Sequence, residues 1–298
     1  MAMSITGVSA LPRAAMQAPR FLGAQQSRNM ATLKEIKTRL VSVTNIQKIT
    51  KSMKMVSAAK FSRAERQMKA GMPFARGAAG LSKAAEITVE DDYQGRVIIC
   101  LSSDRGLCGG IHSAITKAVK PVLSKDSEAK VFIWGDKVRM QLQRIYPKNI
   151  QAHFAEIGKR PPVFVEAAAL ADYVLSSGVE WNKGQVYYNE FLSAIAYEPT
   201  SLTIFNPSSL SEMESIASKY EVDEGTLESY GEFTLASTLY GSMLIAQAAE
   251  QSARMQAMEN ATSNAGDMIE KLTLRYNRTR QAVITNELIE IISGAAAV

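Results

Sequence analysis

The feature that most constrains this chain is a proline-free stretch over about residues 228–294. Small or apolar side chains recur at steps of three and four residues through positions 235–283, which is the period of an α-helix. At 1.5 Å per residue, one helix over this stretch would be roughly 100 Å long. Such a helix needs a coiled-coil partner, a membrane or a repeat array, and its frequent charges exclude the membrane. We therefore predict a partner helix that approaches closely along the alanine-rich centre of the stripe, residues 246–265.

The predicted partner is a second helical pattern that begins near Leu33. Its apolar positions, again three or four residues apart, are Leu33, Ile36, Leu40, Val43, Ile46, Ile49, Met53 and Val56. Their average step is below 3.6, which favours a left-handed supercoil with a partner. Gly71 and Pro73 are expected to kink or break this helix, with the pattern resuming from Phe74 to about Ala85. Because these two helices flank an insertion, they must be antiparallel if they pair with each other.

The first helical pattern is strongly basic. Residues 34–69 hold seven lysines and three arginines against two glutamates, a net charge of +8. One interpretation is a solvated helix face, and the other is an anionic partner. A nucleic acid would be such a partner, but the stretch carries no zinc, helix-turn-helix or RNP signature and only Phe61 as an interleaved aromatic. An acidic protein surface fits equally well.

Between the two helical patterns, residues 96–206 alternate short β-rich runs with helical ones. Strands are predicted at residues 97–101, 131–134, 151–156, 185–191 and 201–205. Helices are predicted at residues 111–123, 136–145 and 163–175. This alternation indicates a small α/β domain with a largely parallel sheet. The predicted fold class is therefore α/β, with a long antiparallel coiled coil of terminal helices and an inserted, Rossmann-like domain.

The predicted domain organisation has five parts. Residues 1–30 resemble a mitochondrial presequence, because three arginines precede the first acidic residue, Glu35; the alternative is that Met30 is a second start. Residues 31–90 form the first coiled-coil helix, 91–206 the inserted domain, 207–227 an acidic linker and 228–298 the second coiled-coil helix. No run in the presequence is long and apolar enough to span a bilayer.

Candidate catalytic chemistry is sparse. The chain holds two cysteines and two histidines, too few for a disulfide scaffold or a histidine-based metal site. A glycine-rich turn at residues 103–110 could hold a phosphate, yet it matches neither G-x-x-x-x-G-K-[ST] nor G-x-G-x-x-G. Cys108 and His112 could form a thiolate–imidazole pair, but no third partner presents itself. We therefore predict a structural turn, with no catalytic, cofactor-binding or metal site; an enzyme built on the α/β domain is the alternative.

Three motifs resemble those of one family, the gamma subunits of F-type ATP synthases, in the mitochondrial form. The terminal ITNELIEIISGA at residues 284–295 is similar to that family's C-terminal signature. ATLKEIK at residues 31–37 leads into NIQKITKSMKMV at 45–56, as in the family's first helix, and SDRGLCG at 103–109 resembles its turn in the inserted domain. The resemblance covers the whole chain after the presequence.

The resemblance implies a non-catalytic rotor shaft at the matrix face of the mitochondrial inner membrane. Its expected partners are the alpha and beta subunits of the catalytic ring, the delta and epsilon stalk subunits and the membrane c-ring, with no nucleic acid and no transmembrane segment. The basic face of the first helix, with Lys48, Lys51 and Lys54, would face acidic loops of the beta subunits. The expected polar contacts with those subunits are Arg254, Arg280, Gln281, Thr285 and Glu287.

Overall fold

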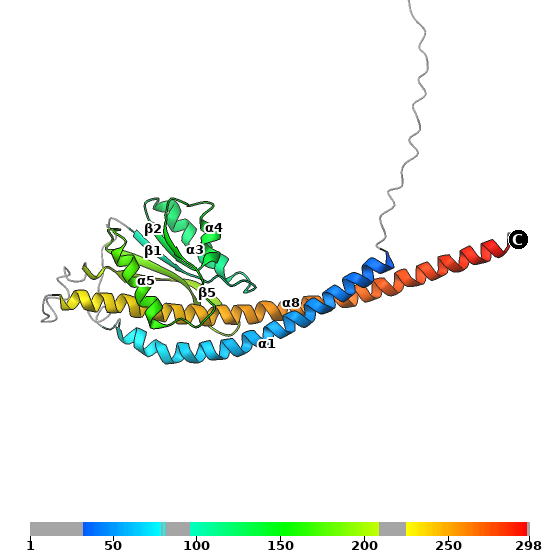
Figure 1. Ribbon diagram of the computed structural model, residues 1–298, viewed down its shortest axis with the longest axis horizontal. Coiled ribbons are helices and arrows are strands. Elements are labelled where there is room, and N and C mark those ends of the chain that lie inside the picture. The colour runs from blue at the N-terminus through cyan, green and yellow to red at the C-terminus, as the bar shows by residue number, and fades with distance from the viewer. Residues whose placement is uncertain (1–31, 79, 81–95, 209–224, 297–298) are drawn as a thin grey trace, which may run out of the picture. The chain divides into compact units, whose positions relative to one another are not determined.

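The computed structural model describes residues 32–78, 80, 96–208 and 225–296 (Figure 1). The predicted presequence and residues 209–224 of the acidic linker lie outside these ranges. The chain divides into two compact units, one made of residues 39–274 and one that takes in the described residues before and after that range. All packing described below belongs to the unit of residues 39–274.

Helix α1, Leu33–Ala78, is one uninterrupted helix. It begins with a capping box, in which the Glu35 amide donates to Thr32 Oγ1 (3.3 Å) and the Thr32 amide donates to Glu35 Oε2 (3.0 Å). The predicted break at Gly71 and Pro73 is wrong. Proline removes one intrahelical hydrogen bond, but tertiary packing holds the last turns, since Phe74 makes edge contacts with other aromatic rings at 5.6 and 5.7 Å.

The inserted domain is built on a five-stranded sheet in the order β3-β2-β1-β4-β5. Its strands are β1 (Arg96–Leu101), β2 (Lys130–Trp134), β3 (Ile150–Phe154), β4 (Lys183–Phe191) and β5 (Tyr197–Phe205). All neighbours are parallel except β4 and β5, which form an antiparallel hairpin. The prediction of a largely parallel sheet is confirmed. Strand β5 starts earlier than predicted because Pro199 is accommodated on this edge strand, where a missing amide donor is tolerated.

Helices cover both faces of the sheet (Figure 1). Helices α3 (Ile111–Lys125) and α4 (Asp136–Leu142) pack on one face, around Ile98, Cys100 and Ile133. The other face carries α5 (Phe164–Ser176) and the first part of α8 (Thr226–Ala296), around Ile99 and Phe132. Strands buried on both sides read as continuous apolar runs, as RVIICL in β1 does.

Helix α8 has two buried faces, and this corrects the predicted position of the helix seam. Leu235, Leu239 and Met243 pack on the sheet, and Ala249 and Ala253 pack on Cys108 and Ile111 of the inserted domain. The stripe expected to receive the partner helix therefore contacts the inserted domain through its first half. The period of three and four residues identified the buried face but not the partner that covers it.

Four contacts identify the face of α8 that packs against α1. From one contact to the next, the residue number rises along α8 and falls along α1. A Cβ at Gly241 would lie 2.6 Å from Ala75 Cβ, and one at Gly71 would lie 2.4 Å from Leu244 Cδ1. Further along, Lys54 Nζ lies 2.6 Å from Glu259 Oε1, and Thr262 Oγ1 donates to Thr50 Oγ1 at 2.8 Å. The long terminal helices are therefore packed antiparallel, as predicted, and glycines permit their closest approach.

Gly241→Ala tests this close approach. The added methyl group would meet another methyl group, so the helices must separate, and overpacking of this kind costs about 1–3 kcal/mol. We expect a lower free energy of unfolding for the full chain in urea. The matched control is Gly77→Ala on α1, where an added Cβ has no neighbour within 4 Å and the helical gain from alanine is up to about 1 kcal/mol. Equal effects of the two substitutions would contradict the close packing.

Candidate functional site

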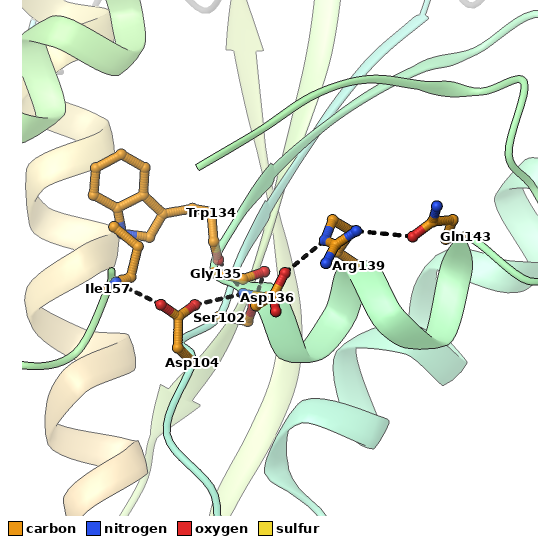
Figure 2. Close-up of polar contacts among 8 residues, drawn as sticks. All are labelled: Ser102, Asp104, Trp134, Gly135, Asp136, Arg139, Gln143 and Ile157. Atoms are coloured by element: carbon orange, nitrogen blue, oxygen red, sulfur yellow. Dashed lines mark hydrogen bonds and ion pairs between the residues drawn. The ribbon is translucent and has the colours of Figure 1, made fainter. Parts of the chain in front are cut away.

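The glycine-rich turn follows β1 and is organised by Asp104 (Figure 2). Asp104 Oδ1 accepts a hydrogen bond from the Asp136 amide at 2.6 Å, and Oδ2 accepts one from the Ile157 amide at 3.0 Å. Nearby, Ser102 Oγ donates to the Trp134 carbonyl at 2.8 Å. The carboxylate thus ties together the segments that follow β1, β2 and β3.

Asp104 also determines what the turn can bind. The Asp136 amide is the first of α4, where a free amide group would favour an anion. Here that amide already holds a carboxylate, which would repel a phosphate. Gly135 has φ 96°, and a Cβ there would lie 2.6 Å from Ser103 backbone atoms, so the glycine permits tight packing of the two loops. The geometry favours the predicted structural turn over a phosphate site.

Cys108 and His112 do not form a catalytic pair. Both side chains point to the Arg105 carbonyl oxygen, with Cys108 Sγ at 3.6 Å and His112 Nε2 at 3.1 Å. Burial raises the pKa of the Cys108 thiol to about 11 and lowers the pKa of His112. Both groups are therefore neutral near pH 7, whereas a nucleophilic pair requires a thiolate.

Arg254 of α8 joins the same turn to the helix and belongs to a buried ion pair. Arg254 and Glu250 lie one helical turn apart, both are buried, and the guanidinium NH2 group donates to Glu250 Oε1. Arg254 Nε also donates to the Gly106 carbonyl at 3.3 Å. The ion pair lies within α8 and holds the Arg254 side chain in place, because breaking a buried pair leaves an uncompensated charge. The bond from this fixed side chain to the Gly106 carbonyl then favours one position of the turn on α8.

A second polar contact joins α8 to the β4–β5 hairpin. Ser252 Oγ donates to the Ala194 carbonyl at 2.6 Å. Together with the apolar contacts of Ala249 and Ala253, these bonds hold α8 against two separate loops of the inserted domain. The helix cannot rotate about its own axis without breaking them.

The structure places the predicted contact residues in different environments. Arg280, Gln281, Thr285 and Glu287 are all exposed on α8, and Thr285 Oγ1 donates to the Gln281 carbonyl at 2.8 Å. On α1, Lys48 and Lys51 are exposed, whereas Lys54 is half-buried and paired with Glu259. Arg254 is buried and bound within the chain. Their contacts with other subunits stay a prediction.

Sequence reasoning missed the residues that lock the inserted domain to α8. Glu250 precedes Arg254 by four residues, and this spacing could have indicated an ion pair. Ser252 and the carbonyl oxygens of Gly106 and Ala194 carry no comparable signal, because backbone acceptors are available at every position. Asp104 could have been recognised only as a polar residue after a strand. Within the ranges that the structure describes, no group of three or more His, Cys, Asp or Glu side chains could hold a metal ion.

Comparison with known proteins places the whole described chain in one family. The profile of the family described as ATP synthase matches residues 32–298. The mitochondrial ATP synthase subunit gamma of Drosophila melanogaster is 48% identical over 276 residues, which are 92% of this chain and 93% of the fly protein. The mitochondrial ATP synthase F(1) complex subunit gamma of Rattus norvegicus is 45% identical over 271 residues, 90% of this chain and 99% of the rat protein.

A solved structure shares the architecture. It is a chain in the cryo-EM structure of the central stalk and c-ring of Tetrahymena thermophila mitochondrial ATP synthase, with a TM-score of 0.64 and 28% identity. The match covers 72% of this chain and 99% of that chain. The similarity therefore extends over most of this chain and nearly all of that one.

The state of Cys108 gives a direct test of the site's chemistry. A rise in pKa from 9.0 to about 11 lowers the thiolate fraction at pH 8 by roughly 100-fold. We expect iodoacetamide to alkylate Cys108 in the folded chain at least that much more slowly than in the chain unfolded in guanidinium chloride, as measured by mass spectrometry. Cys100, which is also buried, serves as an internal reference. A folded-state rate for Cys108 close to the unfolded-state rate would mean that the thiolate is stabilised.

Proposed function

The chain belongs to the family of ATP synthase gamma subunits, and on that premise we propose that it is the central stalk subunit of a mitochondrial F-type enzyme. It turns inside the ring of alpha and beta subunits and couples proton flow through the c-ring to ATP synthesis. It is not itself catalytic. It lies at the matrix face of the inner membrane, and none of its helices within the described ranges has the length and apolar character needed to cross a bilayer.

The observation that carries this proposal is that α8 is shared between two packed assemblies. One face of α8 is part of the core of the inserted domain, and another face packs on α1. Torque applied to the inserted domain is therefore passed to the helix pair through a buried interface and through the bonds of Arg254 and Ser252. A pair of packed helices also resists bending better than a single helix.

In the proposed mechanism, this subunit acts through the shape of its helical shaft and not through reactive groups. An asymmetric shaft inside a ring with threefold pseudosymmetry presents a different face to each catalytic site. Each face makes different contacts, so each site is biased toward a different conformation and nucleotide affinity. Rotation of the shaft then moves every site through the same series of states.

The proposed partners are those that membership of the family implies. The alpha and beta subunits surround the helix pair, and the exposed Lys48 and Lys51 face acidic loops of beta. Lys54 already binds Glu259, and Arg254 binds Glu250 and the Gly106 carbonyl, so each would contact beta through its remaining N–H donors. The inserted domain contacts the c-ring and the delta and epsilon subunits.

Arg280→Ala combined with Gln281→Ala tests where coupling resides. Both side chains are exposed, and arginine can make several directional hydrogen bonds to a carboxylate or carbonyl of beta. Removing them should slow both ATP synthesis and ATP hydrolysis by the assembled complex, by at least about tenfold if each lost contact contributes about 1 kcal/mol. Deletion of residues 295–298 should have a smaller effect, since that segment carries no charged side chain.

Both variants must first be shown to assemble, with the tagged chain co-purifying with alpha and beta subunits in a fixed stoichiometry. A deletion as damaging as the double substitution would place the coupling in the terminal segment. A wild-type chain that never co-purifies with those subunits would remove the proposed function itself.

A further inference from the structure

Helix α1 carries only two aromatic side chains, and each of them contacts the inserted domain. The Phe61 ring lies 5.5 Å from the ring of Phe191, the last residue of β4. The Phe74 ring lies 5.6 Å from the ring of Phe164, the first residue of α5. Phe61 and Phe74 are 13 residues apart, which is about 20 Å along the helix. The inserted domain therefore contacts α1 directly at two separate heights.

The face of α1 that packs on α8 is a stripe of small residues. Its members recur every seven residues and are Thr50, Ser57, Ala64, Gly71 and Ala78. All of them are buried except the half-buried Gly71, and the Ala78 carbonyl accepts a hydrogen bond from Thr234 Oγ1 of α8 at 3.1 Å. Small side chains let the two helices approach closely, but they present no large knob that would resist rotation of α1 about its own axis.

The two aromatic rings lie on opposite flanks of this small-residue stripe. Phe61 precedes Ala64 by three residues, and Phe74 follows Gly71 by three residues. At about 100° per residue, these steps place the two rings about 60° from the stripe in opposite directions. Rotation of α1 about its own axis would move one ring toward α8 and the other away from it. Ring contacts on both flanks, at two heights, therefore resist rotation and tilting of α1.

The partners of both rings are anchored away from α1. Phe191 packs with Ala249 and Ala253 of α8 and with Cys108 of the turn. The hairpin that follows Phe191 is closed by its own hydrogen bonds, including one from the Ala196 amide to Ser193 Oγ at 3.1 Å. Phe164 packs against the core between the sheet and α8. These rings therefore give α1 a fixed support within the inserted domain.

We propose that Phe61 and Phe74 are positioning residues that fix the rotation of α1 about its own axis relative to the inserted domain. The exposed Lys48 and Lys51 belong to the same helix, so the direction in which they point depends on these two contacts. This inference rests on the proposed function, in which the inserted domain is driven and these lysines face beta subunits. Torque then reaches α1 directly as well as through α8.

The distance between spin labels on α1 and on the inserted domain tests the proposal in the free full-length chain. Labels at Ala59→Cys on α1 and Lys117→Cys on α3 occupy exposed positions, and both native cysteines are buried. Double electron–electron resonance should give one narrow distance distribution for this labelled chain. Phe61→Ala and Phe74→Ala should each broaden the distribution, and the two together should broaden it further, because α1 can then turn on its small-residue stripe.

Phe154→Ala is the matched control for loss of an aromatic ring. The Phe154 ring contacts the rings of Trp134 and Tyr173, which all belong to the inserted domain, and the label on α3 lies over the other face of the sheet. This control should lower the free energy of unfolding in urea but leave the distance distribution unchanged. An unchanged distribution in the Phe61 and Phe74 variants, or an equal broadening by Phe154→Ala, would overturn the proposal.

A second measurement uses unlabelled chains in the assembled complex. The chain with both Phe61→Ala and Phe74→Ala should still co-purify with alpha and beta subunits, and its rate of ATP synthesis should fall below that of the Phe154→Ala chain. Equal rates would mean that the surrounding ring alone positions α1, and would overturn the role in coupling. A wild-type chain that does not co-purify would instead contradict the proposed function, on which the distance measurement in the free chain does not depend.

Discussion

The rest of this structure depends on one constraint, which is that α8 must be buried on two sides at once. On one side it completes the apolar layer under the sheet, through Leu235, Leu239 and Met243. On another side it packs against α1 so closely that glycine is needed at position 241. Most of the stability of a helix in a protein comes from packing of its apolar face rather than from helix propensity. Its two partners are therefore held in a fixed relation to each other by the helix that they share.

Polar contacts fix the position of α8, which apolar burial alone would leave adjustable. Hydrophobic packing is non-directional, so it could allow α8 to slide or turn by a fraction of a residue. The Arg254 bond to Gly106 and the Ser252 bond to Ala194 exclude such movements, because each would leave a buried polar group without a partner. Asp104 in turn fixes the loop that carries Gly106. A rotor shaft requires such a chain of rigid contacts between the part that is driven and the part that acts on its partners.

Local sequence patterns predicted most of the helices and strands. They did not predict which elements pack against each other. The apolar runs of β1 and β2 and the helical periods of α3 and α5 were placed nearly correctly, since each reflects burial by any neighbour. The break at Pro73 was wrong because tertiary contacts of Phe74 outweighed a local penalty. The stripe on α8 was found but its first half was given the wrong partner, since a period identifies a face and not what covers it. Arg254 was expected to contact a beta subunit only because the family resemblance implies it, and that contact stays a prediction. Its bond to the Gly106 carbonyl was missed because a backbone oxygen leaves no signal in the sequence.

The most direct test of this account is rotation of the inserted domain relative to the catalytic ring. Because both native cysteines are buried, Asp172→Cys on the exposed side of α5 offers a unique position for a reporter. The complex would be fixed to a surface through its beta subunits and supplied with ATP, and the orientation of the reporter would be followed in single molecules. The account predicts that the reporter turns in one direction through many revolutions while ATP is hydrolysed. Hydrolysis at the normal rate with a stationary reporter would contradict it.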